Sequence, residues 1–259
     1  MAKQISFLRE MLLADGYVPF RAPEIGLPKY ITDDQATLIK QAQGLSVDRT
    51  SKGNRFRCYH KAIYTPWNDQ MIFLPASTDI ATGEKYFPFR QGSENPEFAN
   101  RVRRFQPMPE AMQRNPALRQ LVKADFLLSP FANCRDEAFA LRFHVIRHTV
   151  EPGEQAASSP DLLHTDDVAY SVIHIIERSG VNGGVNCVAA HEHAGKRWDE
   201  VPIRDVLAQL TFTGLFSGLA FLDDRVSHYV SPIEAAANVP GARAVVIIDI
   251  ARIQESKNM

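Results

Sequence analysis

The second half of the chain is a series of short apolar runs separated by turn residues. In residues 139–146, apolar side chains recur at every second position, which is the period of a β-strand with one buried face. The pair Gly183-Gly184 predicts a turn between two of the runs. Several short strands between turns are typical of a β-sandwich or a β-barrel. The other runs cover residues 168–176, 185–190, 201–207, 211–212, 218–222 and 243–250.

The first half mixes helical and extended patterns. Residues 1–16 place apolar side chains at helical spacing with charged residues between them, which predicts a short amphipathic helix rather than a signal peptide. Residues 32–44 and 109–122 predict two further helices, because each begins with residues suited to a helix start. Residues 63–74 predict short strands, and residues 76–97, rich in Gly, Pro, Ser and Asn, predict a loop.

No flexible linker separates the two halves, so we expect one domain over residues 1–259. Helices and outer strands in residues 1–138 would pack around a β core in residues 139–252. The expected fold class is therefore mainly β with flanking helices, a form of α+β.

The overall charge excludes some partners. The chain has 29 Lys and Arg residues against 30 Asp and Glu residues, a net charge of -1, which gives no general attraction to nucleic acid or anionic lipid. Its apolar runs are shorter than a membrane span needs. Its three cysteines lie far apart in the sequence, which argues against a disulfide framework and a zinc knuckle. We expect a cytoplasmic protein that binds a small molecule, with no nucleic acid or membrane partner.

The sequence His164-Thr165-Asp166 is the strongest chemical signal. Residues two apart on an extended segment point the same way, so His164 and Asp166 can both face one point. An imidazole nitrogen and a carboxylate oxygen are two of the three protein ligands of a non-heme Fe(II) site. The third must be another histidine, and His228, which follows an apolar strand and a turn, is the best candidate.

Arg243 opens the last apolar run, beyond His228 in the chain. A buried arginine is always charged and needs an anion, and its planar fork suits a carboxylate. A dicarboxylate that binds iron at one end and Arg243 at the other fits this order of residues. The order as a whole favours a functional site, although a His-x-Asp tripeptide alone is common by chance.

Other histidines leave alternatives open. Tyr170 and His174 share the even phase of His164 and Asp166, so an unbroken strand would point both into the barrel, toward a cofactor or substrate. A core histidine bonded to a neighbour is an equal alternative for His174. His144 can face the cavity or solvent.

Two more groups carry competing interpretations. His191 and His193 have metal-ligand spacing, but their polar surroundings favour an exposed loop. The basic cluster in residues 49–61 and a second one, Arg101, Arg103 and Arg104, are typical of a solvated face. One narrower alternative is that an arginine of the first cluster, such as Arg55 or Arg57, grips a substrate carboxylate.

At these motifs the chain resembles the iron(II)/2-oxoglutarate dioxygenases of the bacterial L-isoleucine dioxygenase family, which includes biofilm-stimulator BsmA homologues. The resemblance is clearest over residues 139–252, and in the first half only Arg55-Phe56-Arg57 before Tyr59 carries it. The motifs are His164-Thr165-Asp166-Asp167-Val168-Ala169-Tyr170, Glu177-Arg178, Asn182-Gly183-Gly184 and Asp223-Asp224-Arg225 followed by His228.

The resemblance implies a double-stranded β-helix, a jelly roll of the cupin kind, with Fe(II) and 2-oxoglutarate as cofactors. It implies that His164, Asp166 and His228 are catalytic iron ligands and that Arg243 holds the distal carboxylate of 2-oxoglutarate. The implied reaction uses O₂ to hydroxylate or sulfoxidise a free L-amino acid or close derivative, releasing succinate and CO₂.

Asp167 and Val185 depart from the family pattern, where glycine and an acidic residue are expected. Asp167, beside the metal ligands, is therefore expected to affect substrate choice. Two alternatives remain: a cupin-like metalloenzyme that does not use 2-oxoglutarate, and a non-catalytic regulatory protein that binds the metal and 2-oxoglutarate.

Overall fold

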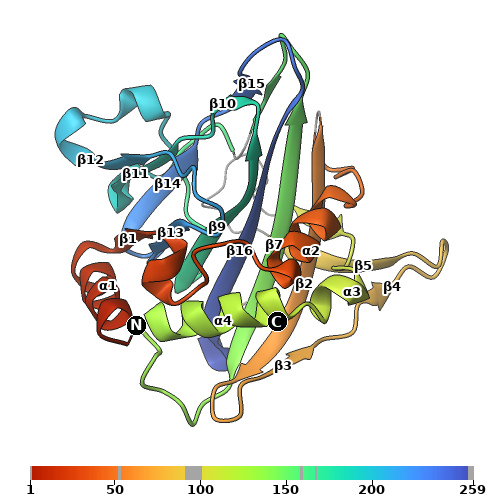
Figure 1. Cartoon of the computed structure of the whole chain (residues 1–259), viewed down its shortest axis with the longest axis vertical. Coiled ribbons are helices and arrows are strands. Elements are labelled where there is room, and N and C mark those ends of the chain that lie inside the picture. Colours follow the sequence, from red (N-terminus) through yellow and green to blue (C-terminus); the bar gives the residue numbers. More distant parts are fainter. Residues whose placement is uncertain (1, 52–53, 91–100, 158–159, 167, 256–259) are drawn as a thin grey trace.

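A seven-stranded antiparallel sheet forms the centre of the protein (Figure 1). In this computed structural model the described residues are 2–51, 54–90, 101–157, 160–166 and 168–255. The strand order is β1-β13-β9-β16-β7-β2-β3, so strands of the first half lie at both edges and strands of the second half lie in the middle. These strands are β1 (Tyr17–Phe20), β2 (Arg55–Thr65), β3 (Gln70–Phe73), β7 (Phe139–Val150), β9 (Tyr170–Ser179), β13 (Gly218–Phe221) and β16 (Gly241–Arg252).

A smaller sheet of order β12-β11-β14 faces one side of the large sheet. An apolar cluster joins the two sheets, with Ile175 and Phe221 from the large sheet packed together with Val188 and Val226 from the small one. The strands of the small sheet are β11 (Asn186–Ala190), β12 (Val206–Leu210) and β14 (Val226–Val230). Two more three-stranded sheets flank this core, made of β8 (Gln155–Ala156), β10 (Val181–Gly183) and β15 (Ile233–Ala235), and of β4 (Ser77–Thr78), β5 (Lys85–Arg90) and β6 (Val102–Phe105).

Helices cover the opposite side of the large sheet, where α4 lies across the strands between α1 and α3 (Figure 1). Leu12, Leu38 and Leu118 come from three different helices and share one apolar core with strand residues such as Phe143. The Thr32 hydroxyl accepts a hydrogen bond from the Gln35 N–H and so fixes the start of α2. The helices are α1 (Ala2–Asp15), α2 (Asp33–Gln43), α3 (Glu110–Gln113) and α4 (Pro116–Leu128), with 3-10 turns at Ala22–Ile25, His191–His193, Trp198–Glu200, Ile203–Asp205 and Ile253–Glu255.

The central strands are therefore buried on both faces. On β7, Phe143 and Val145 belong to the helix-side core, whereas His144 and Ile146 face the small sheet. Alternation of side chains along a strand explains this division. The expected fold class, mainly β with flanking helices, is confirmed.

Several local predictions were wrong. The run over residues 201–207 contains a 3-10 turn at Ile203–Asp205 and becomes a strand only at β12, and residues 211–212 form no strand. Residues 85–90 of the predicted loop form strand β5, because Phe87 and Phe89 alternate inward and pack on Tyr59. The loop's residues 91–97 lie outside the described residues. The predicted helix over residues 109–122 is split into α3 and α4, because Asn115 caps a new helix that starts at Pro116.

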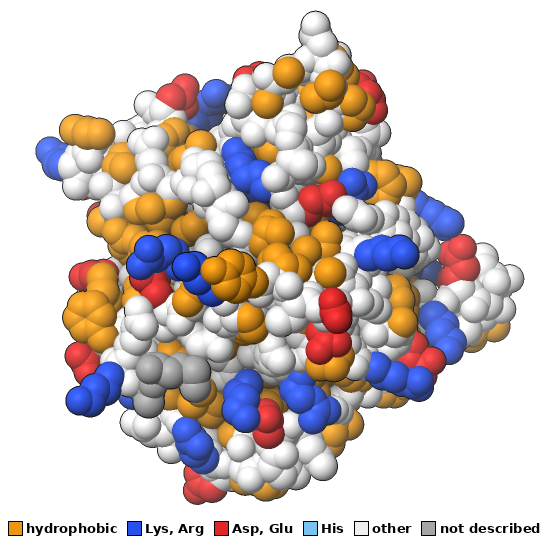
Figure 2. Space-filling model, in the orientation of Figure 1, with side chains coloured by type: hydrophobic (Ala, Val, Ile, Leu, Met, Phe, Trp, Pro, Cys, Tyr) orange, Lys and Arg blue, Asp and Glu red, His pale blue; other side chains and the backbone are white. Residues whose placement is uncertain are grey.

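The surface in the view of Figure 1 carries both signs of charge. Basic and acidic side chains lie interspersed among apolar ones on this face (Figure 2). In the described parts of the chain, no helix is both long and apolar enough to cross a membrane.

Candidate functional site

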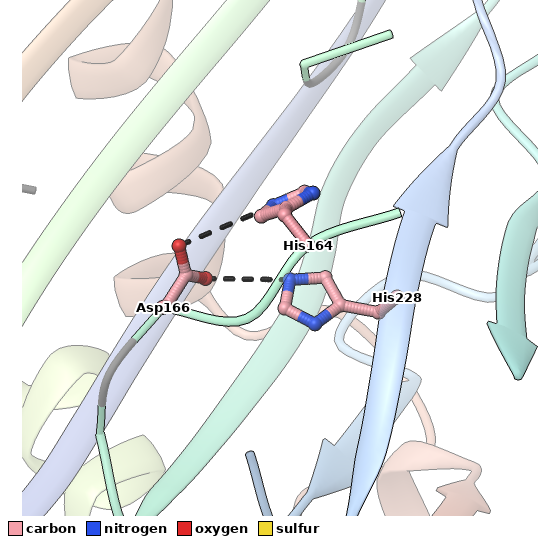
Figure 3. Close-up of side chains that lie close together, drawn as sticks. All are labelled: His164, Asp166 and His228. Carbon is pink, nitrogen blue, oxygen red and sulfur yellow. Dashed lines mark ion pairs between the residues drawn. The ribbon is translucent and has the colours of Figure 1, made fainter. Parts of the chain in front are cut away.

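Two histidines and one aspartate meet between the two sheets (Figure 3). His164 and Asp166 lie on the segment that leads into β9, and His228 lies on β14. The backbones of His164 and His228 form an isolated antiparallel bridge with two N–H···O bonds of 3.0 Å each. This bridge sets two side chains that are far apart in sequence next to each other.

The three side chains point their ligand atoms at one spot. Nε2 of His228 lies 3.3 Å from one oxygen of Asp166, and Nε2 of His164 lies 4.0 Å from the other. All three ligand atoms lie within 4.8 Å of one another, so one metal ion can contact them all. Two imidazole nitrogens and one carboxylate are the donor set of a non-heme Fe(II) facial triad, which leaves other positions on the metal open.

Neighbouring groups orient these side chains. The Nδ1–H of His164 donates to the Leu162 carbonyl at 3.1 Å, which leaves Nε2 as the ligand atom. Nδ1 of His228 lies 3.8 Å from the buried carboxylate of Asp223. The other oxygen of Asp223 accepts the backbone N–H groups of Asp166, at 2.5 Å, and of Val168, at 3.3 Å. Asp223 therefore connects both segments that supply the three side chains.

The charges of this group suit a cation. Burial, together with the neighbouring His228, lowers the pKa of His164 to about 4, so its imidazole is neutral. Burial disfavours the Asp166 carboxylate, but the hydrogen bond and the charge of His228 outweigh burial and lower the pKa of Asp166. The same pairing raises the pKa of His228 against the effect of burial. Burial and the charge of Asp166 raise the pKa of Asp223 to about 7.

A cavity extends from this group over the inner face of the large sheet. Its floor is built from rows of side chains that the antiparallel register sets side by side. Arg243 on β16 lies between Arg178 on β9 and His148 on β7, which makes one end of the floor basic. The lining residues are Arg55, Arg57, Phe89, Arg103, Arg142, His144, Ile146, Pro160, His164, Asp166, Ile173, Phe221, His228, Val230, Arg243, Val245, Ile247 and Asp249.

Arg243 is the clearest anion site in this cavity. Its side chain is only 2% exposed, yet Nε and Nη2 have no hydrogen-bond partner among the described residues. Burial, with the charge of Arg178, lowers the pKa of Arg243 to about 10, so the guanidinium still carries its charge at neutral pH. Gly184, at a φ of +63°, makes room for it, because a Cβ there would lie 2.9 Å from Arg243 Cδ. A carboxylate would satisfy these donors.

The other end of the floor is an internal ion pair. Arg142 Nε donates to Asp249 at 3.1 Å, and the Ser171 hydroxyl donates to the second oxygen of Asp249. His144 faces the cavity, which decides between its two alternatives. Its Nε2 lies 3.8 Å from Asp249.

The prediction that Tyr170 and His174 face the site is wrong. His174 is fully buried on the helix side, where its Nε2 donates to Asp125 of α4 at 2.9 Å, and the Tyr170 hydroxyl donates to the Asp125 carbonyl at 3.2 Å. Even-numbered residues of β9 do not share the direction of His164 and Asp166, because β9 begins only at Tyr170. The alternative of a core histidine bonded to a neighbour holds.

The structure also bears on the predictions for the histidine pair at 191 and 193 and for Val185. His191 is exposed as expected, but His193 is buried and its Nε2 donates to Asp205 at 3.0 Å. Val185 packs in a small apolar cluster with Leu163. Asp167 lies outside the described residues.

Sequence reasoning missed the roles of Asp223 and Asp249. Asp223 belongs to an Asp-Asp pair after an apolar run, and Asp249 interrupts the last apolar run. A single carboxylate at the inward phase of an otherwise apolar strand is the signal that points to a buried polar site. Arg55, Arg57 and Arg103, from the two basic clusters, line the cavity rather than a solvated face.

A jelly-roll-like pair of sheets with two histidines and a carboxylate at one point is the arrangement of non-heme iron oxygenases. Known proteins agree with this class. The chain belongs to the 2OG-Fe dioxygenase family, whose family model matches residues 40–249. The cofactors of this family are Fe(II) and 2-oxoglutarate, and its members are oxidoreductases.

Individual relatives support the same family. Over 246 residues the chain is 25% identical to the 3(1)-hydroxy-L-isoleucine 4-dioxygenase of Pantoea ananatis (strain AJ13355), covering 93% of this chain and 90% of that protein. The structure matches a bsmA homolog from Methylobium petroleophilum PM1 with a TM-score of 0.74 at 18% identity, over 96% of this chain and 93% of that one. It matches IDO from Bacillus thuringiensis with a TM-score of 0.72 at 16% identity, over 96% and 99%. These matches confirm the jelly-roll fold and the resemblance to this family.

Proposed function

We propose that the protein is an Fe(II)/2-oxoglutarate-dependent dioxygenase that hydroxylates or sulfoxidises a free L-amino acid or a close derivative. The observation that carries this proposal is the buried Arg243, whose Nε and Nη2 lack a hydrogen-bond partner among the described residues, in one cavity with His164, Asp166 and His228. The amino-acid substrate is inferred from a relative whose name states such a substrate.

In this proposal His164, Asp166 and His228 hold the iron, and Arg243 binds the distal carboxylate of 2-oxoglutarate. When bound, Fe(II) and 2-oxoglutarate supply the oxidation: O₂ is consumed, 2-oxoglutarate becomes succinate and CO₂, and one oxygen atom enters the substrate. The apolar middle of the floor, Ile146, Val245 and Ile247, limits water near the reacting atoms. The protein thus orients the reactants while the cofactors carry the chemistry.

We further propose that residues 1–259 act as one dioxygenase domain, because strands from both halves of the chain pair in one sheet. The proposed partners are O₂ and a small-molecule substrate. A reducing, cytoplasmic setting suits the three free cysteines, Cys58, Cys134 and Cys187.

The test is an anaerobic absorption titration of the metal-free protein with Fe(II) and then 2-oxoglutarate. We expect a visible charge-transfer band in the wild type and none in His164→Ala or Asp166→Ala. A panel of amino acids, assayed for succinate release under O₂, then tests the substrate class. Turnover by either ligand variant at the wild-type rate would overturn the metal assignment.

The two alternatives give different results in the same experiments. A cupin-like enzyme without 2-oxoglutarate predicts no band and no effect of Arg243→Ala on 2-oxoglutarate affinity. A regulatory protein predicts the band but no succinate from any substrate pool. The family match favours the 2-oxoglutarate-dependent enzyme over the first alternative.

A further inference from the structure

The cavity contains more positive charge than its own carboxylates balance. Five arginines and two aspartates line it. Arg142 is paired with Asp249, and Arg55 is paired at 2.8 Å with Asp48, which lies outside the lining. In the proposed function Asp166 binds the metal and Arg243 binds 2-oxoglutarate.

Arg57 is a second arginine in the cavity that lacks an ion-pair partner; its side chain is partly exposed, but its Nε is buried. Among the described residues no carboxylate lies within ion-pair distance of it, and its buried Nε has no hydrogen-bond partner. Burial, with the charges of Arg103 and Arg55, lowers the pKa of Arg57 to about 9, so it remains charged at neutral pH. A guanidinium with a buried donor that has no partner is unfavourable unless an anion joins it.

The guanidinium of Arg57 is held in a fixed place. It lies 4.1 Å from the centre of the Phe105 ring and 5.8 Å from that of Phe89, which positions the fork by stacking. Its Nη2 donates to Nδ1 of His144 at 2.6 Å. Nδ1 must therefore be unprotonated, so the proton of His144 is on Nε2, which faces Asp249. His144 thus positions Arg57 from one side.

We propose that Arg57 binds a carboxylate of the organic substrate, which makes a free carboxylate a requirement for turnover. This inference rests on the proposed function, because it assigns Arg243 to 2-oxoglutarate and so leaves Arg57 for the second organic acid. Arg57 lines the same cavity as His164 and Asp166, so a substrate held there lies beside the proposed metal. A planar arginine fork recognises a carboxylate with two parallel bonds and offers nothing equivalent to a carboxamide.

The test compares wild type, Arg57→Gln, Arg57→Lys and Arg104→Gln. Arg104 is a matched control, because its guanidinium also stacks on an aromatic ring, Tyr86 at 4.4 Å, but it is exposed, pairs with Asp79 and does not line the cavity. Each protein, loaded with Fe(II) and 2-oxoglutarate, is assayed for succinate with two pools of compounds that are matched one to one and used at equal concentrations. One pool holds free L-amino acids, N-acyl amino acids and hydroxy acids, and the other holds the corresponding carboxamides.

We expect the acid pool, and not the amide pool, to stimulate succinate release by wild type and Arg104→Gln. In Arg57→Gln the KM for the most active acid should rise at least about tenfold, because a charge-assisted bond is lost. Arg57→Lys should recover part of this loss, because it restores the charge without the fork. The 2-oxoglutarate charge-transfer titration should be unchanged in all four proteins, which also shows that the variants are folded.

Three results would overturn the inference while leaving the dioxygenase assignment intact. These are equal stimulation of wild type by the amide pool, no stimulation by any acid, and an unchanged KM in Arg57→Gln. A weakened 2-oxoglutarate titration in Arg57→Gln would also overturn it, by assigning Arg57 to the cosubstrate. Absence of the band in wild type would instead show that the proposed function has failed.

Discussion

Replacing Asp223 by alanine should weaken metal binding although Asp223 is not one of the three proposed ligands. The substitution removes the acceptor for the N–H groups of Asp166 and Val168 and the carboxylate beside His228. Above pH 7, where the Asp223 carboxyl is ionised, a bond to this charged acceptor contributes about 1.5–3 kcal/mol. The longer bond, at 3.3 Å, adds little, so the loss is about 2 kcal/mol.

This free energy enters metal binding directly, because the segment with His164 and Asp166 must be ordered for one ion to contact all three side chains. A loss of about 2 kcal/mol corresponds to a dissociation constant for the metal that is larger by roughly 30-fold. That value lies within the 10- to 100-fold range, about 1.4–2.8 kcal/mol, that is typical for groups that orient metal ligands. Asp223→Asn keeps an oxygen acceptor, so its loss should be smaller.

The assay is an anaerobic calorimetric titration with Fe(II), with the free energy of unfolding measured in urea to show that each variant is folded. Asp224→Ala is the matched control, because it removes the same charge from the adjacent, exposed residue. Wild-type iron affinity in a folded Asp223→Ala would refute the reasoning. So would an equal loss in Asp224→Ala, because the effect would then be one of net charge.

Three more predictions follow from other parts of the structure. Arg243→Met should raise the dissociation constant for 2-oxoglutarate at least about tenfold and leave Fe(II) affinity unchanged in calorimetry, because only the anion partner is lost. Asp125→Ala leaves His174 unpaired in the core, so the free energy of unfolding in urea should fall by about 3–5 kcal/mol, with no change in 2-oxoglutarate affinity; a changed affinity would return His174 to the site. Burial lowers the pKa of His60 to about 4, below its unfolded value, so its neutral form is favoured in the fold and stability should decline as the pH falls from about 6.5 toward 4. Urea titrations at pH 7 and pH 5 should show a smaller decline in His60→Gln than in wild type.

The sequence pattern was sufficient for the β core and for the gathering of His164, Asp166 and His228. Apolar runs between turn residues predicted the central strands β7, β9, β13 and β16, and the order of turns placed His228 after a strand. The prediction that Tyr170 and His174 face the site was wrong because the alternation of side chains continues only along an unbroken strand. Strand β9 starts at Tyr170, after Asp166. No local rule reports such a break.

Contacts between segments that are distant in the chain also could not be predicted from the sequence. Arg57 stacks on Phe105 and bonds to His144 from another strand, and these partners are set by sheet register rather than by neighbours in the chain. The same holds for Asp223, whose role depends on the backbone N–H of Asp166. The sequence showed which charged residues could carry chemistry. Only the strand register of the sheet showed which of these residues are in contact.

Because the central strands are buried on both faces, their residues fall into two groups, one that packs the helix-side core and one that lines the cavity. Phe143 on β7 packs against the helices, while its neighbours Arg142 and His144 line the cavity. Substitutions at even positions of β7 and odd positions of β16 can therefore give a new ligand preference while the helix-side core stays unchanged. Libraries restricted to those positions, with the buried Arg142–Asp249 ion pair kept, would explore new chemistry without altering the helix-side core.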